Sequence, residues 1–376
     1  MKPVANSSSD GPAAKALRAH LAAAGGSVPF EEWMRWALYD GEHGYYTRRV
    51  RTVGREGDFS TAATLGTVLA DAVAAWAAHH REDGMGADGR WHLIELGGGS
   101  GALAARVLGS LGWWARRRVR YHVVEVSEGL RTAQRAALAR WGARVSWHGT
   151  LADALAAAGG AGLIFSNEFV DAFPCARWVW REGWREVRVA WPDGADRPGE
   201  VVGGAVGAEE RAATSVGGEE FARAAWPGQV VEVFASYRAW LREQFAGWRR
   251  GRLLTIDYGD EVAALYARRP AGTLRAYCRQ LRFTGAEVYA RIGQQDLTAD
   301  VNFTDLWRWG EALGLRPAGL RTQADFLRGW LRPATLARAS RDVRGAALLD
   351  PEGAGGAFKV LEQVREAGRD GGQIAA

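Results

Sequence analysis

The sequence predicts an α/β fold, in which a mainly parallel sheet carries helices on its faces. From Trp91 onward, short apolar runs alternate with segments of helical periodicity. Strands and helices that alternate at this spacing are typical of a parallel sheet. The first apolar run ends at the glycine-rich turn 97–101, which indicates a ligand site at the carboxyl end of that strand. A later run, 252–259, resumes the pattern after a long interruption.

The individual elements follow from the same patterns in chain order. Strands are predicted at 91–96, 121–126, 144–148, 162–166 and 252–259, with 315–322 and 357–364 as candidates for the last two. Helices are predicted over 13–24, 30–38, 64–82, 102–111, 128–140, 150–158, 235–248 and 303–314. Two alternating runs around Glu182 and Gly183 predict a β-hairpin. The polar, glycine-rich interval 192–218 predicts a mobile loop.

These elements predict one catalytic domain with an N-terminal helical region and an inserted α+β subdomain. The predicted segments are a disordered tail over 1–12, the helical region over 13–90, the core over 91–173 and 251–362, the inserted subdomain over 174–250 and a flexible tail over 363–376. The sequence contains no internal repeat that would indicate a solenoid or another repeat architecture.

The composition restricts the class of protein. Apolar residues make up 47% of the chain and charged residues 24%, as in ordinary soluble globular proteins. The sequence has no run of about 18 apolar residues, which a transmembrane helix would need. Its first residues lack the apolar core of a signal peptide. Cys175 and Cys278 stand at no metal-ligand spacing. We therefore expect no metal site, no disulfide framework and a cytoplasmic location.

The positive charge of the chain restricts its partners less. A net charge of +5 permits an acidic partner without establishing one. The densest basic stretch, 116–120, lies between a predicted helix end and a predicted strand, and it is first interpreted as a solvated turn. Because no recognition motif accompanies the charge, we expect no nucleic acid partner. The chain also has 18 tryptophans, an unusually high number for which core filling and an aromatic-lined groove are the available explanations.

The turn after the first strand is the strongest functional signal. Gly97, Gly99 and Gly101 let the backbone pass close to a ligand where a side chain would clash. The same segment satisfies the dinucleotide pattern G-x-G-x-x-A, so a nicotinamide or flavin dehydrogenase is an alternative. Glu95 favours a methyltransferase, because an acid two residues before the turn suits the cationic, amino-acid end of S-adenosylmethionine. Glu125 ends the next strand, where it would accept hydrogen bonds from the ribose hydroxyls of either cofactor.

Polar side chains follow two further strands. Asn167, Glu168 and Asp171 come after the fourth strand, and Asp257 ends the fifth. Because open α/β sheets bind ligands at the carboxyl ends of their strands, these residues are candidates for the acceptor site. A helical first turn after the fourth strand would put Glu168 and Asp171 on one face. The alternative is that the two carboxylates only cap that helix.

These segments together resemble the MidA family of class I methyltransferases over about 28–362. The resemblance rests, in chain order, on FEEWMRWALYDGEHGYYTRR, GREGDFSTA, IELGGGSGAL, YHVVEVSEGLRTAQRAAL, SNEFVDAFP, LLTIDYGD, GTLRAYCR, DLTADVNF, RTQADFL and FKVL. It implies a Rossmann-like, seven-stranded methyltransferase sheet that binds S-adenosyl-L-methionine. For the eukaryotic relatives it also implies dimethylation of an arginine in a complex I subunit, during assembly of that mitochondrial complex.

The resemblance also implies roles for residues of this chain. The family's signature after the fourth strand maps onto Asn167, Glu168, Asp171 and Pro174, and its N-terminal motif maps onto Gly57, Asp58 and Phe59. We therefore expect the cofactor to be bound by Glu95, Gly97, Gly99, Gly101, Glu125, Asn167 and Asp58. Glu168 and Asp171 are expected to act on the acceptor, with Asp58 and Asp257 as reserves.

The chain departs from the family pattern at a few positions. Asp300 stands where the family usually has a histidine, and Asn302 stands where it has an aspartate. The glycine loop lacks the proline that many relatives have in its middle, and no mitochondrial presequence is evident. The first two departures bear on the choice of substrate, because they fall in a segment close to the expected acceptor pocket.

The favoured function is therefore a protein methyltransferase that acts on arginine. An arginine acceptor is protonated at neutral pH, so carboxylates must hold the guanidinium and orient one nitrogen as its proton leaves. Two alternatives stay open: a methyltransferase for a small molecule or another acceptor, and an assembly protein with little turnover. We expect a protein substrate and no membrane insertion, and the oligomeric state is open, a homodimer included.

Overall fold

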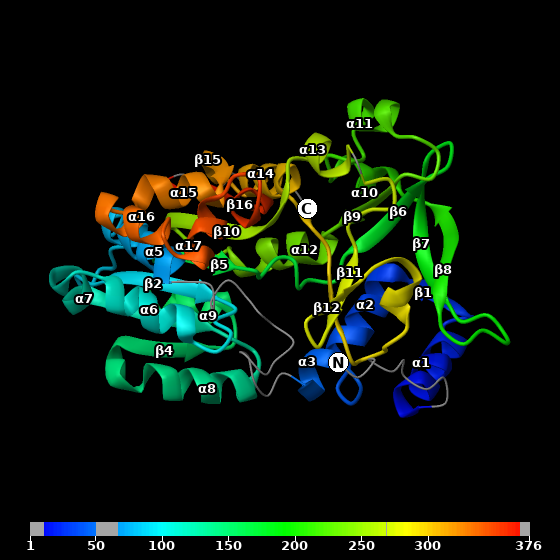
Figure 1. Cartoon of the computed structure of the whole chain (residues 1–376), viewed down its shortest axis with the longest axis horizontal. Coiled ribbons are helices and arrows are strands. Elements are labelled where there is room, and N and C mark those ends of the chain that lie inside the picture. The colour runs from blue at the N-terminus through cyan, green and yellow to red at the C-terminus, as the bar shows by residue number, and fades with distance from the viewer. Residues whose placement is uncertain (1–10, 50–66, 268, 369–376) are drawn as a thin grey trace. The chain divides into compact units, whose positions relative to one another are not determined.

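The computed structural model describes residues 11–49, 67–267 and 269–368 (Figure 1). The chain divides into two compact units. The first, which we name the sheet unit, comprises Thr52–Phe169, Arg238–Asp260 and Leu306–Ala376. The second, which we name the insert unit, comprises Met1–Arg51, Val170–Tyr237 and Glu261–Asp305.

Within the described residues, the sheet unit contributes seven strands to one mostly parallel sheet. They are β2 (Trp91–Leu96), β3 (Val119–Val124), β4 (Val145–His148), β5 (Ala161–Asn167), β10 (Arg250–Asp260), β15 (Arg316–Thr322) and β16 (Phe358–Arg365). Their order across the sheet is β15-β16-β10-β5-β2-β3-β4. The strands from β10 to β4 are parallel, and β16 is antiparallel to β10 and β15. The carboxyl ends of the parallel strands therefore share one edge, where open α/β sheets bind ligands.

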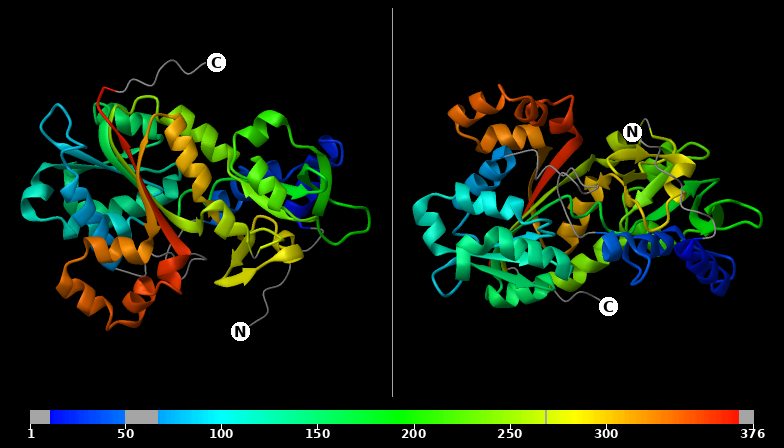
Figure 2. Two further views of the ribbon diagram at one scale, coloured as in Figure 1. Left: turned by 90° about the horizontal axis from the view of Figure 1, so that it is seen from above. Right: turned by 60° about the horizontal axis from the view of Figure 1, so that its bottom comes forward.

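Helices cover both faces of this sheet (Figure 2). They are α5 (Thr67–His79), α6 (Ala102–Ser110), α7 (Trp113–Arg118), α8 (Glu128–Leu138), η1 (Ala139–Arg144), α9 (Leu151–Ala157), α12 (Ala235–Gln244), α14 (Phe303–Ala312), α15 (Gln323–Trp330), α16 (Pro333–Ala339), α17 (Val343–Leu349) and α18 (Ala354–Ala357). On one face, α5 packs against α6 and α15. Fully buried Trp76, Trp91, Leu93 and Phe165 belong to the apolar core there. All six residues of β2 are buried, because helices cover the sheet on both faces.

The insert unit contains two antiparallel sheets and short helices. The larger sheet has the order β1-β7-β6-β9, with β8 beside β7, and the smaller one has the order β12-β11-β13. The strands of this unit are β1 (Ser27–Pro29), β6 (Ala176–Trp180), β7 (Trp184–Ala190), β8 (Gly199–Ala205), β9 (Val230–Val233), β11 (Arg275–Cys278), β12 (Leu281–Phe283), β13 (Asp296–Thr298) and β14 (Val301–Asn302). Its helices are α1 (Pro12–Ala23), α2 (Phe30–Tyr39), α3 (Tyr45–Arg49), α10 (Ala208–Ala212), α11 (Glu219–Ala224), α13 (Val262–Tyr266) and η2 (Gly285–Tyr289). Trp178, Trp184 and Tyr266 are buried in its core.

The predicted α/β fold is confirmed, and most predicted elements differ from the observed ones only at their ends. The predicted hairpin is formed by β6 and β7, in which Trp180 pairs with Trp184. The prediction of a mobile loop over 192–218 is wrong, because this interval contains β8 and α10. In β8, Val202 pairs with Val187 of β7. Pairing with a neighbouring strand stabilises extended backbone that glycine-rich composition alone does not indicate.

The limits of the two units differ from the predicted segments. The insert unit contains 170–237, and it also takes in the N-terminal segment and 261–305. The N-terminal segment joins it because β1 pairs with β7, with Val28 opposite Val189. The predicted N-terminal helical region is thus divided, since α5 packs in the sheet unit. Residues 1–10 and 369–376 of the predicted tails lie outside the described residues.

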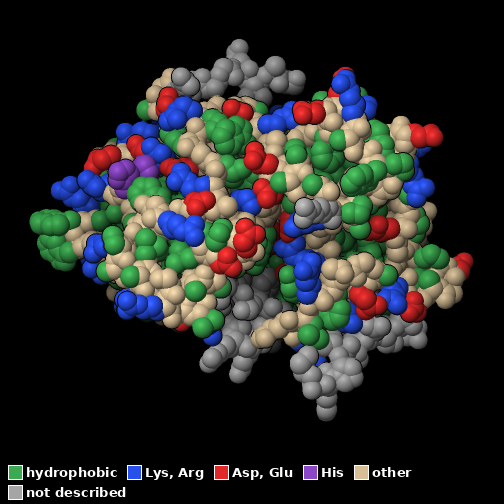
Figure 3. Space-filling model, turned by 45° about the horizontal axis from the view of Figure 1, so that its top comes forward, with side chains coloured by type: hydrophobic (Ala, Val, Ile, Leu, Met, Phe, Trp, Pro, Cys, Tyr) green, Lys and Arg blue, Asp and Glu red, His purple; other side chains and the backbone are tan. Residues whose placement is uncertain are grey.

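The surface and the helices bear on membrane contact. None of the helices in the described part of the chain is long and apolar enough to cross a membrane. On the face drawn in Figure 3, Lys and Arg side chains are interspersed with Asp and Glu side chains.

Candidate functional site

The glycine-rich turn joins β2 to α6 at the carboxyl edge of the sheet. Gly97, Gly99 and Gly101 have φ angles of 66°, 51° and 80°, in the left-handed region that favours glycine. Gly101 precedes the first residue of α6 as its N-cap. The Gly97 amide donates to the carbonyl of Val124 at 3.0 Å, which fixes the start of the turn against β3.

The space around the turn differs from one glycine to the next. A Cβ added at Gly97 would lie 2.8 Å from Cδ2 of Phe169, and one added at Gly98 would lie 2.8 Å from Cγ1 of Val123. A Cβ added at Gly99 would meet no atom of the described residues within 4 Å. The turn is therefore packed against the protein at Gly97 and Gly98 and open at Gly99, where a ligand can approach the backbone.

Glu125 follows β3 directly and is held from two directions. Its carboxylate accepts hydrogen bonds from the Ser127 amide at 2.9 Å and from Nε2 of Gln134 at 3.2 Å. Only 7% of its surface is exposed, and burial raises the pKa of the carboxyl. The structure thus places Glu125 at the carboxyl edge of the sheet, as expected for a residue that accepts hydrogen bonds from ribose.

Gln134 is a site residue that the sequence analysis missed. It lies on the inner face of α8 and is fully buried. Its Nε2 donates to the carbonyl of Gly99 at 2.9 Å as well as to Glu125, and its Oε1 accepts from Nε1 of Trp147 at 3.1 Å. A single amide therefore joins the glycine turn to the expected ribose acid. The available signal was a polar residue on the apolar face of an amphipathic helix.

Glu95 is buried beneath the turn. Its side chain accepts a hydrogen bond from the hydroxyl of Tyr121 at 2.9 Å, and 2% of its surface is exposed. Burial raises the pKa of Glu95 to about 7, and the nearby charge of Glu125 adds to this effect. A cation bound beside the turn would favour the ionised carboxylate, which is the role expected for Glu95 at the amino-acid end of the cofactor.

The end of β5 carries two buried oxygen atoms that no described residue satisfies. Oγ of Ser166 and Oδ1 of Asn167 have no hydrogen-bond partner among the described residues. Ser166 pairs with Leu96, the last residue of β2 before the glycine turn. Buried polar atoms are nearly always paired in proteins, so this pair of oxygens indicates a ligand or solvent at the edge of the sheet.

The segment after β5 is not helical, and the predicted helical first turn is wrong. Residues 168–174 form bends and a turn, and Glu168 has a left-handed φ of 52°. The Glu168 amide donates to the carbonyl of Ile256 at 3.0 Å, and the Phe169 amide donates to Oδ2 of Asp257 at 3.2 Å. These bonds to β10 hold the chain in a turn instead of a helix, so helix capping explains neither Glu168 nor Asp171.

Asp257 is fully buried and anchors backbone. Besides the hydrogen bond from the Phe169 amide, its carboxylate accepts one from the backbone amide of Tyr258 at 2.9 Å. This role in shaping the segment after β5 accounts for its position. The remaining reserve residue, Asp58, lies with Gly57 and Phe59 outside the described residues.

Asp171 belongs to the insert unit, whereas Glu168 belongs to the sheet unit. Oδ2 of Asp171 accepts a hydrogen bond from Oγ1 of Thr298 at 2.9 Å. Burial raises the pKa of this carboxyl, which is 8% exposed. Of the charged groups that act on it, Arg275 lowers its pKa and Asp300 raises it.

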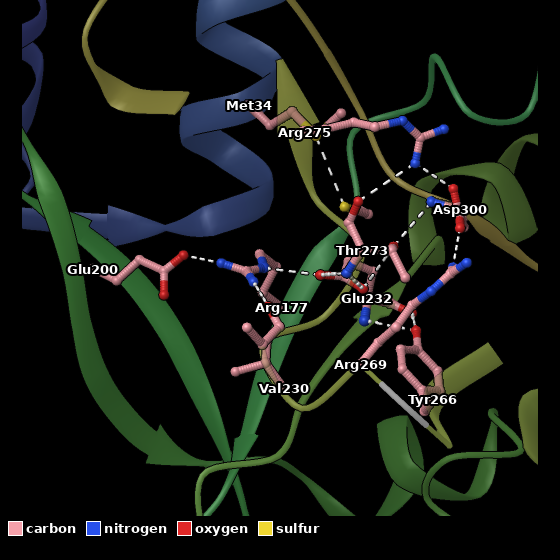
Figure 4. A network of polar contacts seen from close by, with 12 residues as sticks. Met34, Arg177, Glu200, Val230, Glu232, Tyr266, Arg269, Thr273, Arg275 and Asp300 are labelled. Atoms are coloured by element: carbon pink, nitrogen blue, oxygen red, sulfur yellow. Dashed lines mark hydrogen bonds and ion pairs between the residues drawn. The ribbon is translucent and has the colours of Figure 1, made fainter. Parts of the chain in front are cut away.

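The two departures from the family pattern have clear structural roles. Asp300 forms ion pairs with Arg269 and Arg275, as Figure 4 shows. Nδ2 of Asn302 donates to Oγ of Ser215 at 2.8 Å and to Asp305 at 3.0 Å. Arg275 thus acts on two carboxyl groups: it forms an ion pair with Asp300 and lowers the pKa of Asp171.

A second buried network lies beside this one in the insert unit (Figure 4). Glu232 is fully buried and accepts hydrogen bonds from Nε of Arg177 at 3.1 Å and from the amide and hydroxyl of Thr273. Arg177 also pairs with Glu200. Since each charge in this network has an opposite partner, its role is structural. Among the described residues no group of three or more His, Cys, Asp and Glu side chains could hold a metal ion.

Comparison with known proteins gives a family. The model of a family described as "Putative S-adenosyl-L-methionine-dependent methyltransferase" matches residues 69–321. Two curated relatives are both named protein arginine methyltransferase NDUFAF7 homolog, mitochondrial. The protein from Drosophila melanogaster is 33% identical over 212 residues, which cover 50% of this chain and 47% of the relative. The one from Caenorhabditis elegans is 26% identical over 186 residues, covering 44% and 43%. The chain spans about half the length of the curated relatives it matches.

Two solved structures are similar over nearly their whole length. A COG1565 superfamily member from Burkholderia thailandensis, bound to S-adenosyl-homocysteine, is 30% identical with a TM-score of 0.81. A native structure from the same superfamily and organism is 29% identical with a TM-score of 0.78. In both cases the similarity covers 97% of this chain and 95% of the other.

S-adenosyl-L-methionine fits the residues of the sheet unit. The turn leaves room beside Gly99, Glu125 offers a carboxylate to hydroxyl groups, and Glu95 favours a nearby cation. The unpaired oxygens of Ser166 and Asn167 can accept hydrogen bonds from the same ligand. The dinucleotide alternative is therefore set aside. With this fit and the match over 69–321, the chain belongs to the family of S-adenosyl-L-methionine-dependent methyltransferases, and S-adenosyl-L-methionine is its cofactor.

Proposed function

We propose that this chain transfers methyl groups to an arginine side chain of a protein. The names of the two curated relatives support this acceptor. The observation that carries the proposal is the position of Asp171, a carboxyl that is 8% exposed, accepts a hydrogen bond from Oγ1 of Thr298 at 2.9 Å and has a pKa raised by burial. A carboxyl in this state favours a cationic partner, and a guanidinium presents five donors in a flat fork.

The chemistry of the transfer assigns a task to this carboxyl. When bound, the cofactor supplies a methyl group on a positively charged sulfur. Transfer of this methyl group to an arginine nitrogen would leave S-adenosyl-homocysteine and would require that nitrogen to release one proton. Asp171 takes this proton, since a raised pKa brings a carboxyl closer to the value that a general base needs at neutral pH. Orientation of the guanidinium nitrogen in line with the methyl group accelerates the transfer further.

Glu168 is the second carboxylate of the proposal. It holds a left-handed backbone conformation, which a residue other than glycine seldom adopts. Such strained residues cluster at active sites, where the surrounding structure enforces them. Oε1 of Glu168 accepts from Nδ2 of Asn167 at 3.1 Å, so its side chain is oriented at the end of β5. We assign it the role of gripping the guanidinium.

A labelled-methyl assay tests this function. The protein is incubated with methyl-labelled S-adenosylmethionine and lysate of its own host, and the products are separated and analysed by mass spectrometry. The proposal expects label on arginine in a protein, with a subunit of respiratory complex I as the first protein to examine. Label in the small-molecule fraction alone would support a different acceptor, and no label at all would support an assembly role. The Gly99→Val variant serves as the control for label that other enzymes transfer.

A further inference from the structure

Helix α7 carries two neighbouring tryptophans on the surface of the sheet unit. Trp113 is 53% exposed and Trp114 is 78% exposed. Exposed apolar side chains that lie together can mark an interaction site. Their ring centroids lie 4.4 Å apart with the planes at 85°. At the left edge of Figure 3, where α7 lies in Figure 1, hydrophobic side chains protrude among Lys and Arg side chains. The two indoles therefore form a small, protruding apolar surface.

Arginines surround these tryptophans. Arg117 lies over the ring of Trp113 at 4.7 Å, and Arg116 and Arg140 both lie over the ring of Trp141, at 5.9 Å and 4.6 Å. Nη1 of Arg120 donates to the carbonyl of Ala143, next to Arg144, at 3.0 Å. These contacts join α7, η1 and the start of β3 into one surface, which we name the α7 patch. Its residues are Trp113, Trp114, Arg116, Arg117, Arg118, Arg120, Arg140 and Arg144.

Acidic side chains are scarce around the α7 patch. No Asp or Glu occurs between Glu95 and Glu125, or between Glu128 and Asp153. Of the nearby acids, Asp71 accepts a hydrogen bond from Oγ of Ser110, and Asp88 pairs with Arg90 and His92. The six arginines of the patch therefore keep most of their positive charge available to a partner.

The patch lies away from the cofactor turn. The arginines 116–118 immediately precede β3, and Arg144 immediately precedes β4, whereas Glu125 follows the other end of β3. A strand rises about 3.3 Å per residue, so β3 separates the two edges by roughly 20 Å. The function of the turn leaves the patch unexplained.

We propose that the α7 patch binds the surface of an anionic lipid bilayer. Indole rings settle at the boundary between headgroups and acyl chains, and clustered arginines attract anionic headgroups. Nucleic acid fits less well, because stacking needs open ring faces, whereas Arg117 covers Trp113 and the two indoles are perpendicular. A protein partner fits less well too, because a stable interface buries about 800 Å² per partner and the exposed apolar surface here is confined to two side chains. Peripheral contact of this kind needs no spanning helix.

Vesicle binding tests the proposal with the full chain. Sedimentation is measured with vesicles of phosphatidylcholine alone and of phosphatidylcholine mixed with phosphatidylglycerol, at low and high salt. We expect binding only to the anionic vesicles and its loss at high salt. Replacing Arg116, Arg117 and Arg118 by Gln should weaken that binding about 100-fold, since each basic residue near the surface adds to the attraction. The double variant Trp113→Ser, Trp114→Ser should abolish binding to the anionic vesicles.

Matched controls separate the α7 patch from general charge and hydrophobicity. The exposed Arg338, Arg341 and Arg344 are changed together to Gln, and the exposed Trp226 is changed to Ser. Both controls should bind anionic vesicles as the wild type does, and every variant should bind S-adenosyl-homocysteine normally. Equal losses in the controls, equal binding to neutral vesicles or no binding to either kind would overturn the proposal. The proposal would also be overturned if the protein did not bind vesicles but bound a single-stranded oligonucleotide in a way that depends on Trp114.

Discussion

The side chains of Gln134 and Glu125 are joined by a hydrogen bond of 3.2 Å, from Nε2 of the amide to Oε2 of the carboxylate. The same nitrogen donates to the carbonyl of Gly99 at 2.9 Å. The glycine turn and Glu125, the expected ribose acid, are thus joined by one buried residue on α8. A change at Gln134 should therefore act on cofactor binding without touching the cofactor.

Gln134→Ala is expected to weaken binding of S-adenosyl-homocysteine about tenfold, because it removes hydrogen bonds worth about 1 kcal/mol each and loosens Glu125. Isothermal titration measures the change. Thr132→Ala, on the exposed face of the same helix, is the matched control and should bind normally. Equal affinity in Gln134→Ala and Thr132→Ala would show that Gln134 does not position the site.

Glu125→Ala should also reduce affinity for S-adenosyl-homocysteine, by about 1.5–3 kcal/mol if the charged carboxylate accepts from the ribose. Glu128→Ala removes an exposed carboxylate at the start of α8 and serves as the comparison. Similar small effects of both substitutions would remove Glu125 from the cofactor site.

Gly99→Val should abolish cofactor binding and leave the fold largely intact. The backbone at Gly99 is left-handed and its surroundings are open, so a branched side chain fills the ligand's space and strains the turn. Gly89→Val imposes the same strain at an open left-handed glycine in another turn, with φ of 72°. If both variants melt alike and only Gly99→Val loses binding, the loss belongs to the ligand space. Normal binding by Gly99→Val would show that the turn is not the cofactor site.

The pKa of Glu95 predicts a pH dependence of cofactor affinity. Burial raises this pKa from 4.5 to about 7, so the carboxyl is largely neutral below that pH and ionised above it. Binding of a ligand with a cationic amino group should therefore strengthen as pH rises between about 6 and about 8. Glu95→Gln keeps an acceptor for Tyr121 but cannot ionise, so its affinity should be lower above pH 7 and nearly flat. The same profile in both proteins would exclude Glu95 as the responsible group.

His122 predicts a loss of stability in acid. Its imidazole is hydrogen-bonded to His92 at 2.9 Å and to His148 at 3.0 Å. Burial, and to a smaller extent the charges of these two neighbours, lowers its pKa from 6.5 to about 3. In the unfolded chain His122 binds a proton below about pH 6.5, whereas in the folded chain it binds one only below about pH 3. The free energy of unfolding should therefore fall as pH drops through this window. His122→Asn should make denaturant unfolding less dependent on pH there, and His79→Asn, at an exposed position, should not.

The fold could be predicted from the sequence because it depends on local pattern. Strand runs, helical spacing and the glycines at 97, 99 and 101 identify themselves over a few residues. For Gln134 the local pattern indicates only a polar residue on the apolar face of α8. Its bond to the glycine turn depends on Gly99 lying opposite, which no local pattern indicates. The strand β8 was missed for the same reason, because its own residues do not indicate that it pairs with β7.

The acceptor side was predicted less well. Glu168 and Asp171 were expected on one face of a helical turn, and bonds to Ile256 and Asp257 of β10 prevent that helix. Such contacts join residues almost ninety positions apart, and no local pattern indicates them. The roles of Glu168 and Asp171 stay predictions for this reason.

Single-turnover methylation by the amide variants Glu168→Gln and Asp171→Asn tests the central claim most directly. Cofactor affinity and methyl transfer are measured on the same preparations, with Glu182→Gln as the control, because Glu182 is an exposed carboxylate with a similar φ of 58°. The account predicts cofactor affinity within a few-fold of the wild type and transfer slower by about 100-fold or more, as when a general base is lost. Unchanged transfer in both amide variants would contradict it and remove the two carboxylates from the acceptor site.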